Sequence, residues 1–63
     1  MDENEVFAKR IARYRAAHDM SQEEFAAKCR LAMMTVRNVE SGKHKATALT
    51  RAKIELVLEE DNK

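Results

Sequence analysis

Residues 22–42 contain two helical apolar patterns that are out of register with each other, and this break limits what the chain can fold into. One helix face holds Phe25, Ala26 and Cys29, and another holds Val36 and Val39. The register slips between the two groups, as it does where short helices meet through a turn at a steep angle. Ala26 is small enough to let the second helix approach the first. The segment therefore predicts two packed helices joined by a tight turn.

Capping signals indicate where these two helices begin and end. Ser21 followed by Glu24 has the form of a capping box, so the first of them is predicted to start after Ser21. The second is predicted over about residues 33–41, with Gly42 as its C-cap. Its N-cap position is Ala32, which has no side-chain oxygen, so one cap is missing.

Two flanking segments supply the rest of the predicted core. A helix over about residues 5–18 would carry Phe7, Ile11, Tyr14 and Ala17 on one face. A last helix over about residues 48–59, capped by Thr47, would offer Leu49, Ala52, Ile54, Val57 and Leu58. Residues 54–58 also alternate as a strand would, and such a strand could pair with a second copy. We favour the helix because Ala, Leu, Glu, Lys and Arg dominate this segment.

Composition agrees with a small all-α domain. The 63 residues include no proline and one glycine, which disfavours hairpins and sandwiches, and we expect residues 1–63 to form a single domain. No apolar run reaches the roughly 18 residues of a membrane span, and the acidic N-terminus is unlike a signal peptide. The single cysteine, Cys29, is expected to be buried and reduced. These features predict a cytoplasmic protein that does not associate with membranes.

Charge is distributed unevenly along the chain, although the net charge is only +1. Residues 28–45 hold five basic residues, Lys28, Arg30, Arg37, Lys43 and Lys45, against Glu40 alone. The ends are acidic, with Asp2, Glu3 and Glu5 at one and Glu55, Glu59, Glu60 and Asp61 against Lys63 at the other. An anionic partner would be steered to the middle of the chain, unless the pattern is only an ordinary solvated surface.

From about residue 7 to residue 58 the sequence resembles the helix-turn-helix family of the Cro and lambdoid phage repressors. The resemblance rests on Gln22 at the start of the first motif helix, Ala26 four residues later, and the Glu40-Ser41-Gly42 ending. It implies a compact, lambda-repressor-like all-α domain of four or at most five helices with a central helix-turn-helix. Arg30 occupies the turn where the family usually has glycine in a left-handed conformation. A non-glycine residue in that conformation lowers the stability of the fold by about 1 kcal/mol.

The resemblance also implies that the helix over residues 33–41 enters the DNA major groove. The residues expected to read bases are Met33, Met34, Arg37 and Asn38. Arg and Asn suit guanine and adenine, whereas a methionine can only contact a thymine methyl group. The alternatives are that either methionine packs against a helix or a dimer partner, and that Arg37 and Asn38 are merely solvated.

Other residues are expected to hold the DNA backbone or the fold. The expected phosphate-binding residues are Gln22, Thr35, Ser41, Lys43, His44 and Lys45. The loop lysines could equally serve only solubility. From the family we also expect Arg15 and Glu40 to form a partly buried bidentate ion pair that sets the angle between two helices.

The expected function is that of a bacterial or phage-encoded, nucleoid-associated transcriptional regulator. It would bind double-stranded DNA as a two-fold homodimer on a palindromic operator, as a phage- or plasmid-type repressor. An enzyme is not expected, because His18, His44 and Cys29 are scattered and neither a metal-ligand spacing nor a glycine-rich loop is present. No cofactor, metal or small-molecule substrate is therefore expected. The alternative is a protein-binding module or antitoxin that uses Met33 and Met34 in a protein interface.

Overall fold

A computed structural model describes residues 2–60, and these fold into four helices without a strand. The helices are α1 (Glu3–Ala17), α2 (Gln22–Cys29), α3 (Met33–Glu40) and α4 (Ala48–Glu60). The prediction of an all-α fold is confirmed, and residues 54–58 are helical rather than a strand. Asp61 and Lys63, which contributed to the charge count above, lie outside the described residues. No helix among residues 2–60 is long and apolar enough to cross a membrane.

Side-chain caps account for the starts of the first two helices. α1 begins two residues earlier than expected, because the Asp2 carboxylate accepts a hydrogen bond from the Glu5 N–H at 2.9 Å. At α2 the predicted capping box is present: the Ser21 hydroxyl accepts from the Glu24 N–H at 3.0 Å, and the Glu24 carboxylate accepts from the Ser21 N–H at 2.9 Å. The pKa of the Glu24 carboxyl is lowered, first by the hydrogen bond that it accepts from the Ser21 N–H and then by the Ser21 side chain.

The turn between α2 and α3 is closed by Arg30 in the left-handed conformation, with φ 59° and ψ 44°. The Leu31 N–H reaches back to the carbonyl of Ala26 at 2.9 Å, which satisfies a carbonyl at the end of α2. Ala32 is the N-cap of α3 and makes no side-chain cap hydrogen bond, as predicted. At the other end the expectation was off by one residue: Ser41 is the C-cap, and Gly42 follows it with a φ of 77°.

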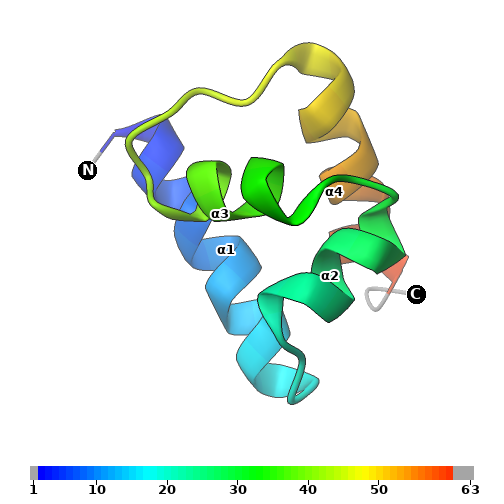
Figure 1. Cartoon of the computed structure of the whole chain (residues 1–63). Coiled ribbons are helices and arrows are strands. Elements are labelled where there is room, and N and C mark those ends of the chain that lie inside the picture. The colour runs from blue at the N-terminus through cyan, green and yellow to red at the C-terminus, as the bar shows by residue number, and fades with distance from the viewer. Residues whose placement is uncertain (1, 61–63) are drawn as a thin grey trace.

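α3 is the central element of the fold, and it crosses in front of the others in Figure 1. It packs on α1 and α2, while α4 closes the far side against the same two helices. The largest fully buried side chains come from all four helices: Ile11, Phe25, Val36 and Ile54. Buried around them are Phe7, Tyr14, Ala26, Cys29, Val39, Val57 and Leu58. The turn that joins α2 and α3 is therefore held by one shared core.

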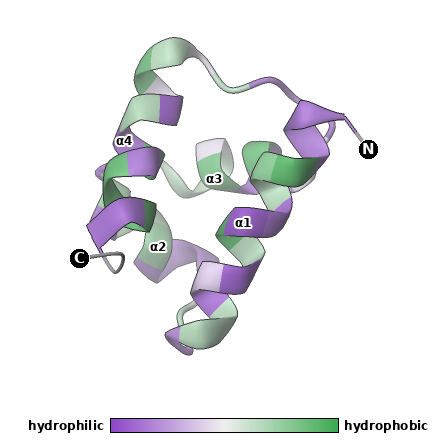
Figure 2. Cartoon of the chain, turned by 180° about the vertical axis from the view of Figure 1, so that it is seen from behind, coloured by the Kyte–Doolittle hydropathy of each residue, from purple (hydrophilic) through white to green (hydrophobic). Residues whose placement is uncertain are grey.

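Three residues expected in the core are exposed. Ala17 is exposed at the C-terminal end of α1, and Leu49 and Ala52 are exposed on α4. Ile54, Val57 and Leu58 decide which face of α4 is buried, and at 100° per residue this turns Leu49 and Ala52 outward. Seen from behind, α1 and α4 alternate polar and apolar positions along their length (Figure 2).

Candidate nucleic-acid interface

The outer face of α3 carries all four residues expected to read bases. Val36 and Val39 are buried, so Met33, Met34, Arg37 and Asn38 project on the opposite side of the helix and are exposed. Met33 is 44% exposed and Met34 is 57% exposed, so neither belongs to the core. Within residues 2–60, the side chains of Arg37 and Asn38 make no hydrogen bond or ion pair. These two polar side chains are thus available to a partner.

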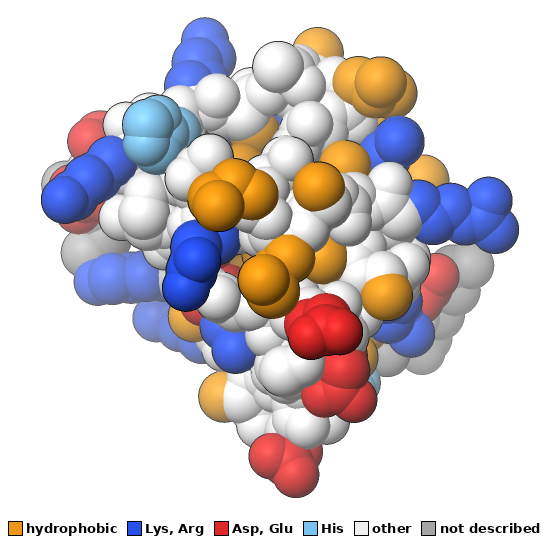
Figure 3. Space-filling model, viewed as in Figure 1, with side chains coloured by type: hydrophobic (Ala, Val, Ile, Leu, Met, Phe, Trp, Pro, Cys, Tyr) orange, Lys and Arg blue, Asp and Glu red, His pale blue; other side chains and the backbone are white. Residues whose placement is uncertain are grey.

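The surface around α3 is mixed in character rather than uniformly basic. In Figure 3, apolar side chains gather over α3 in the middle of the face, with basic side chains on both sides of them and acidic ones below. The acidic group lies over the start of α2, where Glu23 and Glu24 occupy the first turn. Both glutamates are exposed, and the Glu24 carboxylate is engaged in the capping box. These two glutamates precede residues 28–45, so the basic excess of that range does not include their negative charge.

The residues expected to contact phosphates lie on both sides of α3, and some are more exposed than others. Gln22 is the first residue of α2 and is half-buried, as is Thr35 in the first turn of α3. Lys43, His44 and Lys45 are exposed in the loop that follows α3. They lie on the long connection that runs from α3 to α4 in Figure 1. The loop can therefore reach one side of a ligand held by α3, and the N-terminus of α2 the other.

Ser41 differs from the other expected phosphate-binding residues because its hydroxyl is already engaged. It donates to the carbonyl of Asn38 at 2.6 Å and accepts from the Lys43 N–H at 3.2 Å. A hydroxyl has one proton to donate, so this geometry leaves none for a phosphate oxygen. The two bonds hold the end of α3 and the start of the loop together. Ser41 therefore orders the loop in this conformation, and its contact with a phosphate stays a prediction.

Arg15 and Glu40 join α1 to α3 beneath this surface. The Arg15 Nη1 lies 2.5 Å from the Glu40 Oε2, and the side chains are only 23% and 14% exposed. The pair is not bidentate as expected, because the Arg15 Nε donates instead to the carbonyl of Met20 at 3.1 Å. The guanidinium is thus shared between two acceptors. The Glu40 Oε1 is buried, and within the described chain it has no hydrogen-bond partner.

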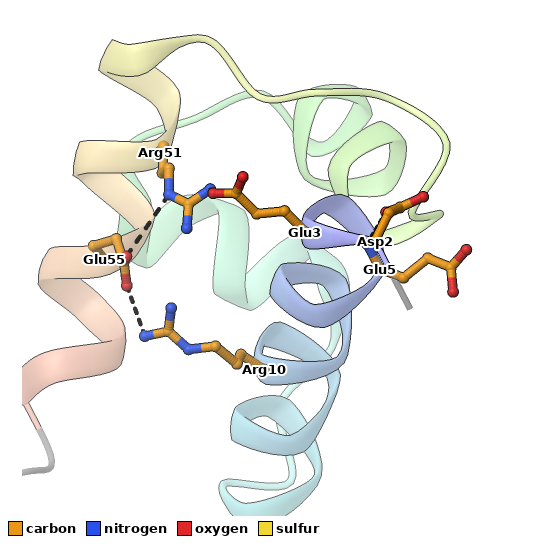
Figure 4. A network of polar contacts seen from close by, with 6 residues as sticks. All are labelled: Asp2, Glu3, Glu5, Arg10, Arg51 and Glu55. Carbon is orange, nitrogen blue, oxygen red and sulfur yellow. Dashed lines mark hydrogen bonds and ion pairs between the residues drawn. The ribbon is translucent and has the colours of Figure 1, made fainter.

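A second ionic cluster, which was not predicted from the sequence, holds α4 against the first half of α1 (Figure 4). Glu55 accepts from Arg10 at 2.7 Å and lies 3.8 Å from Arg51, which also pairs with Glu3 at 3.0 Å. Both guanidinium groups lie over the Phe7 ring, with centroid distances of 5.7 and 4.5 Å. The i, i+4 spacing of Arg51 and Glu55 was a usable signal in the sequence, but their partners 45 or more residues away were not.

Comparison with known proteins adds one finding to this geometry. Residues 11–61 match the helix-turn-helix family. The chain belongs to that family. No curated protein and no solved structure matches the chain.

The family is one of DNA-binding, non-enzymatic domains, so membership supports a DNA-binding regulator in general terms. In helix-turn-helix proteins the second motif helix lies in the major groove and the first crosses the backbone, which here correspond to α3 and α2. Among residues 2–60, no group of three or more His, Cys, Asp or Glu side chains could hold a metal ion.

Proposed function

We propose that this chain is a sequence-specific transcriptional regulator of the Cro and lambdoid repressor type, acting as a phage- or plasmid-type repressor. Its single helix-turn-helix domain inserts α3 into the major groove and binds a palindromic operator as a two-fold dimer. We expect a dimer because one α3 reads only a few base pairs, and so short a sequence occurs too often in a genome to define a specific site.

The observation that supports this proposal most strongly is the outer face of α3. Arg37 and Asn38 are exposed, without an intramolecular partner among the described residues, and lie beside Met33 and Met34. An Arg can make paired hydrogen bonds to guanine and an Asn can make them to adenine. The two methionines offer only apolar contact, which suits thymine methyl groups. We expect an operator half-site that combines such thymines with a G·C pair and an A·T pair.

Contacts with the DNA backbone come mainly from the loop that follows α3. The loop residues Lys43, His44 and Lys45 supply the positive charge, while Gln22 and the free N–H groups of α2 supply neutral donors. Glu23 repels a phosphate at the start of α2, so we expect that contact to be weaker than the one at the loop. Thr35 is positioned to add a hydroxyl from the first turn of α3.

Selection from random double-stranded DNA at stated salt concentrations tests the proposal. We expect enrichment of a palindrome whose half-sites lie about 10 bp apart, centre to centre. Affinity for it should fall steeply as salt rises, because binding releases counterions from the phosphates. Sedimentation at micromolar concentration should show a monomer or weak dimer without DNA. Failure to enrich any sequence, at low salt as well, would contradict the proposal.

A protein-binding role on the same scaffold, such as that of an antitoxin, is the second candidate. The observation in its favour is that Met33 and Met34 are both exposed at the start of α3. Flexible methionines bind protein surfaces adaptably. Salt discriminates the two roles: a methionine-centred protein interface should be nearly insensitive to salt, whereas DNA binding should weaken by orders of magnitude.

A further inference from the structure

The outward face of α4 is apolar and is not covered by any described part of the chain. Leu49 is 68% exposed and Leu56 is 67% exposed, the two highest values among the large apolar residues. With the exposed Ala52 they follow i, i+3, i+7 spacing, which places all three on one side of the helix. Ile54, Val57 and Leu58 bury the opposite side. The three side chains together form an exposed apolar face, which is the kind of surface that contacts other molecules.

A hollow of about 310 Å³ lies beside Leu56, between the C-terminal end of α2 and α4. Its apolar lining is formed by Cys29, Leu56 and Val57. Four charged residues form the rest of its wall: Lys28 and Glu60, whose charged groups are 3.5 Å apart, together with Arg30 and Lys53. The face therefore carries a projecting leucine near the start of α4 and a hollow near its end.

We propose that this face binds the same face of a second copy of the chain, with the two α4 helices antiparallel about a two-fold axis. In such an interface the same patch is used by both subunits, so a projection must face a recess. Leu49 and Leu56 lie two helical turns apart, roughly 10 Å. Leu49 of each copy would then enter the hollow beside Leu56 of the other. Ala52 would lie next to the axis, where its small side chain lets the helices approach.

Charge supports a second copy as the occupant. The outward side of α4 carries Glu59 and Glu60 near its C-terminus, whereas the basic residues 43–45 precede its N-terminus. Antiparallel pairing brings the acidic end of one α4 beside the positive N-terminal end of the other. Lys53, close to the axis, would face its own counterpart, and this repulsion keeps the pair weak in the absence of DNA. The inference rests on the proposed function, since it names the subunit contact of the DNA-bound dimer.

Cysteine cross-linking tests the contact directly. Ala52→Cys places a thiol next to the axis, so we expect a disulfide-linked dimer under mild oxidation on operator DNA. Val6→Cys is the matched control, because Val6 is 46% exposed but lies on α1. Because the two thiols are held close together, the Ala52→Cys dimer should form at least about tenfold faster than the Val6→Cys dimer. Equal rates for the two variants, or no cross-linking at position 52, would overturn the inference.

Truncating the leucines separates the interface from DNA binding itself. Leu49→Ala and Leu56→Ala are surface changes, so they should leave binding to an isolated half-site unchanged. On the two-half-site operator each should lower apparent affinity by about tenfold, which is the size of a typical coupling between sites. Val6→Ala should change neither the affinity for the half-site nor the affinity for the full operator. If both leucine variants still bind the two half-sites cooperatively, the proposed interface is wrong. If the unmodified chain does not bind a half-site at all, the proposed function is contradicted instead.

Discussion

Arg37 and Asn38 reach solvent from the same side of α3 because their neighbours Val36 and Val39 are buried in the core. With 100° between successive residues, burying two positions of so short a helix determines the direction of all the others. Met33 and Met34 turn outward for the same reason. At the scale of single residues, the candidate interface is thus a consequence of which side chains the core takes up.

Base reading and backbone binding should separate by mutation. Arg37→Ala or Asn38→Ala should lose roughly 1–3 kcal/mol on the preferred operator and little on unrelated DNA, because the lost bonds go to bases. Lys45→Ala should weaken all sequences and make the slope of affinity against salt shallower by about one. Met34→Ala should matter only opposite a thymine, and replacing that thymine by uracil should reproduce the loss. Titrations on both kinds of DNA check this, and equal losses for all four changes would mean that α3 is not in the groove.

Cys29 should be chemically inert while the chain is folded. Burial, with a smaller contribution from Glu60, raises the pKa of its thiol from an ordinary 9.0 to about 11. The folded state therefore holds this proton more tightly, so its contribution to stability is complete below pH 9 and is lost between pH 9 and 11. We expect urea unfolding to show a steeper loss of stability above pH 9 in the natural chain than in Cys29→Ala. The same pH dependence in both proteins would contradict this.

At the scale of elements, local interactions stabilise the start of α2 well but stabilise the turn and the start of α3 poorly. The capping box defines the start of α2, but the turn uses Arg30 at a φ of 59° and α3 begins without a side-chain cap. A non-glycine residue in the left-handed region and a missing cap each cost stability. The burial of Phe25 and Val36 compensates for these local defects by holding the two helices together.

Repairing these two local defects should stabilise the chain. Arg30→Gly and Ala32→Ser should each raise the free energy of unfolding by about 1 kcal/mol, the first by relieving the left-handed residue and the second by capping α3. Ala27→Gly, in the body of α2, is the control and should lower the free energy of unfolding by a similar amount. Urea denaturation measures all three. No gain from Arg30→Gly would indicate that the arginine makes a compensating contact.

At the scale of the whole molecule, two ionic contacts connect helices that surround a small core. The radius of gyration is 10.5 Å, and each helix contributes one large, fully buried side chain. Arg15 ties the end of α1 to α3 through Glu40, and Arg10 ties the middle of α1 to α4 through Glu55. The first pair is the more buried, so we expect it to contribute more to the orientation of α3.

A double-mutant cycle tests that expectation. Glu40→Ala should cost about 3 kcal/mol, because it leaves the Arg15 charge largely buried without its partner, and the double change with Arg15→Met should recover much of this. Affinity for all DNA sequences should fall together, since α3 loses its orientation. Glu55→Ala is the control and should cost no more than about 1 kcal/mol, because its partners are more exposed. Strictly additive effects at positions 15 and 40 would show that the two side chains do not interact.

The sequence alone determined where the helices lie and how they are joined. The capping box at Ser21, the change of register after Cys29 and the glycine at residue 42 act on neighbouring backbone groups, so their effect is visible within a few residues. The resemblance to a known family added the pairing of Arg15 with Glu40, which are 25 residues apart and which local patterns do not connect.

Only the tertiary structure decided which apolar residues of α4 are buried and which ions pair across helices. Leu49 and Ile54 are equally apolar in sequence, yet one is 68% exposed and the other is fully buried. The direction of α4 depends on where α1 and α2 already lie. The same dependence explains why the Arg15 guanidinium is shared with the Met20 carbonyl and why Arg10 meets Glu55. Such contacts depend on distances between segments remote in the chain, and these distances exist only once the core has formed.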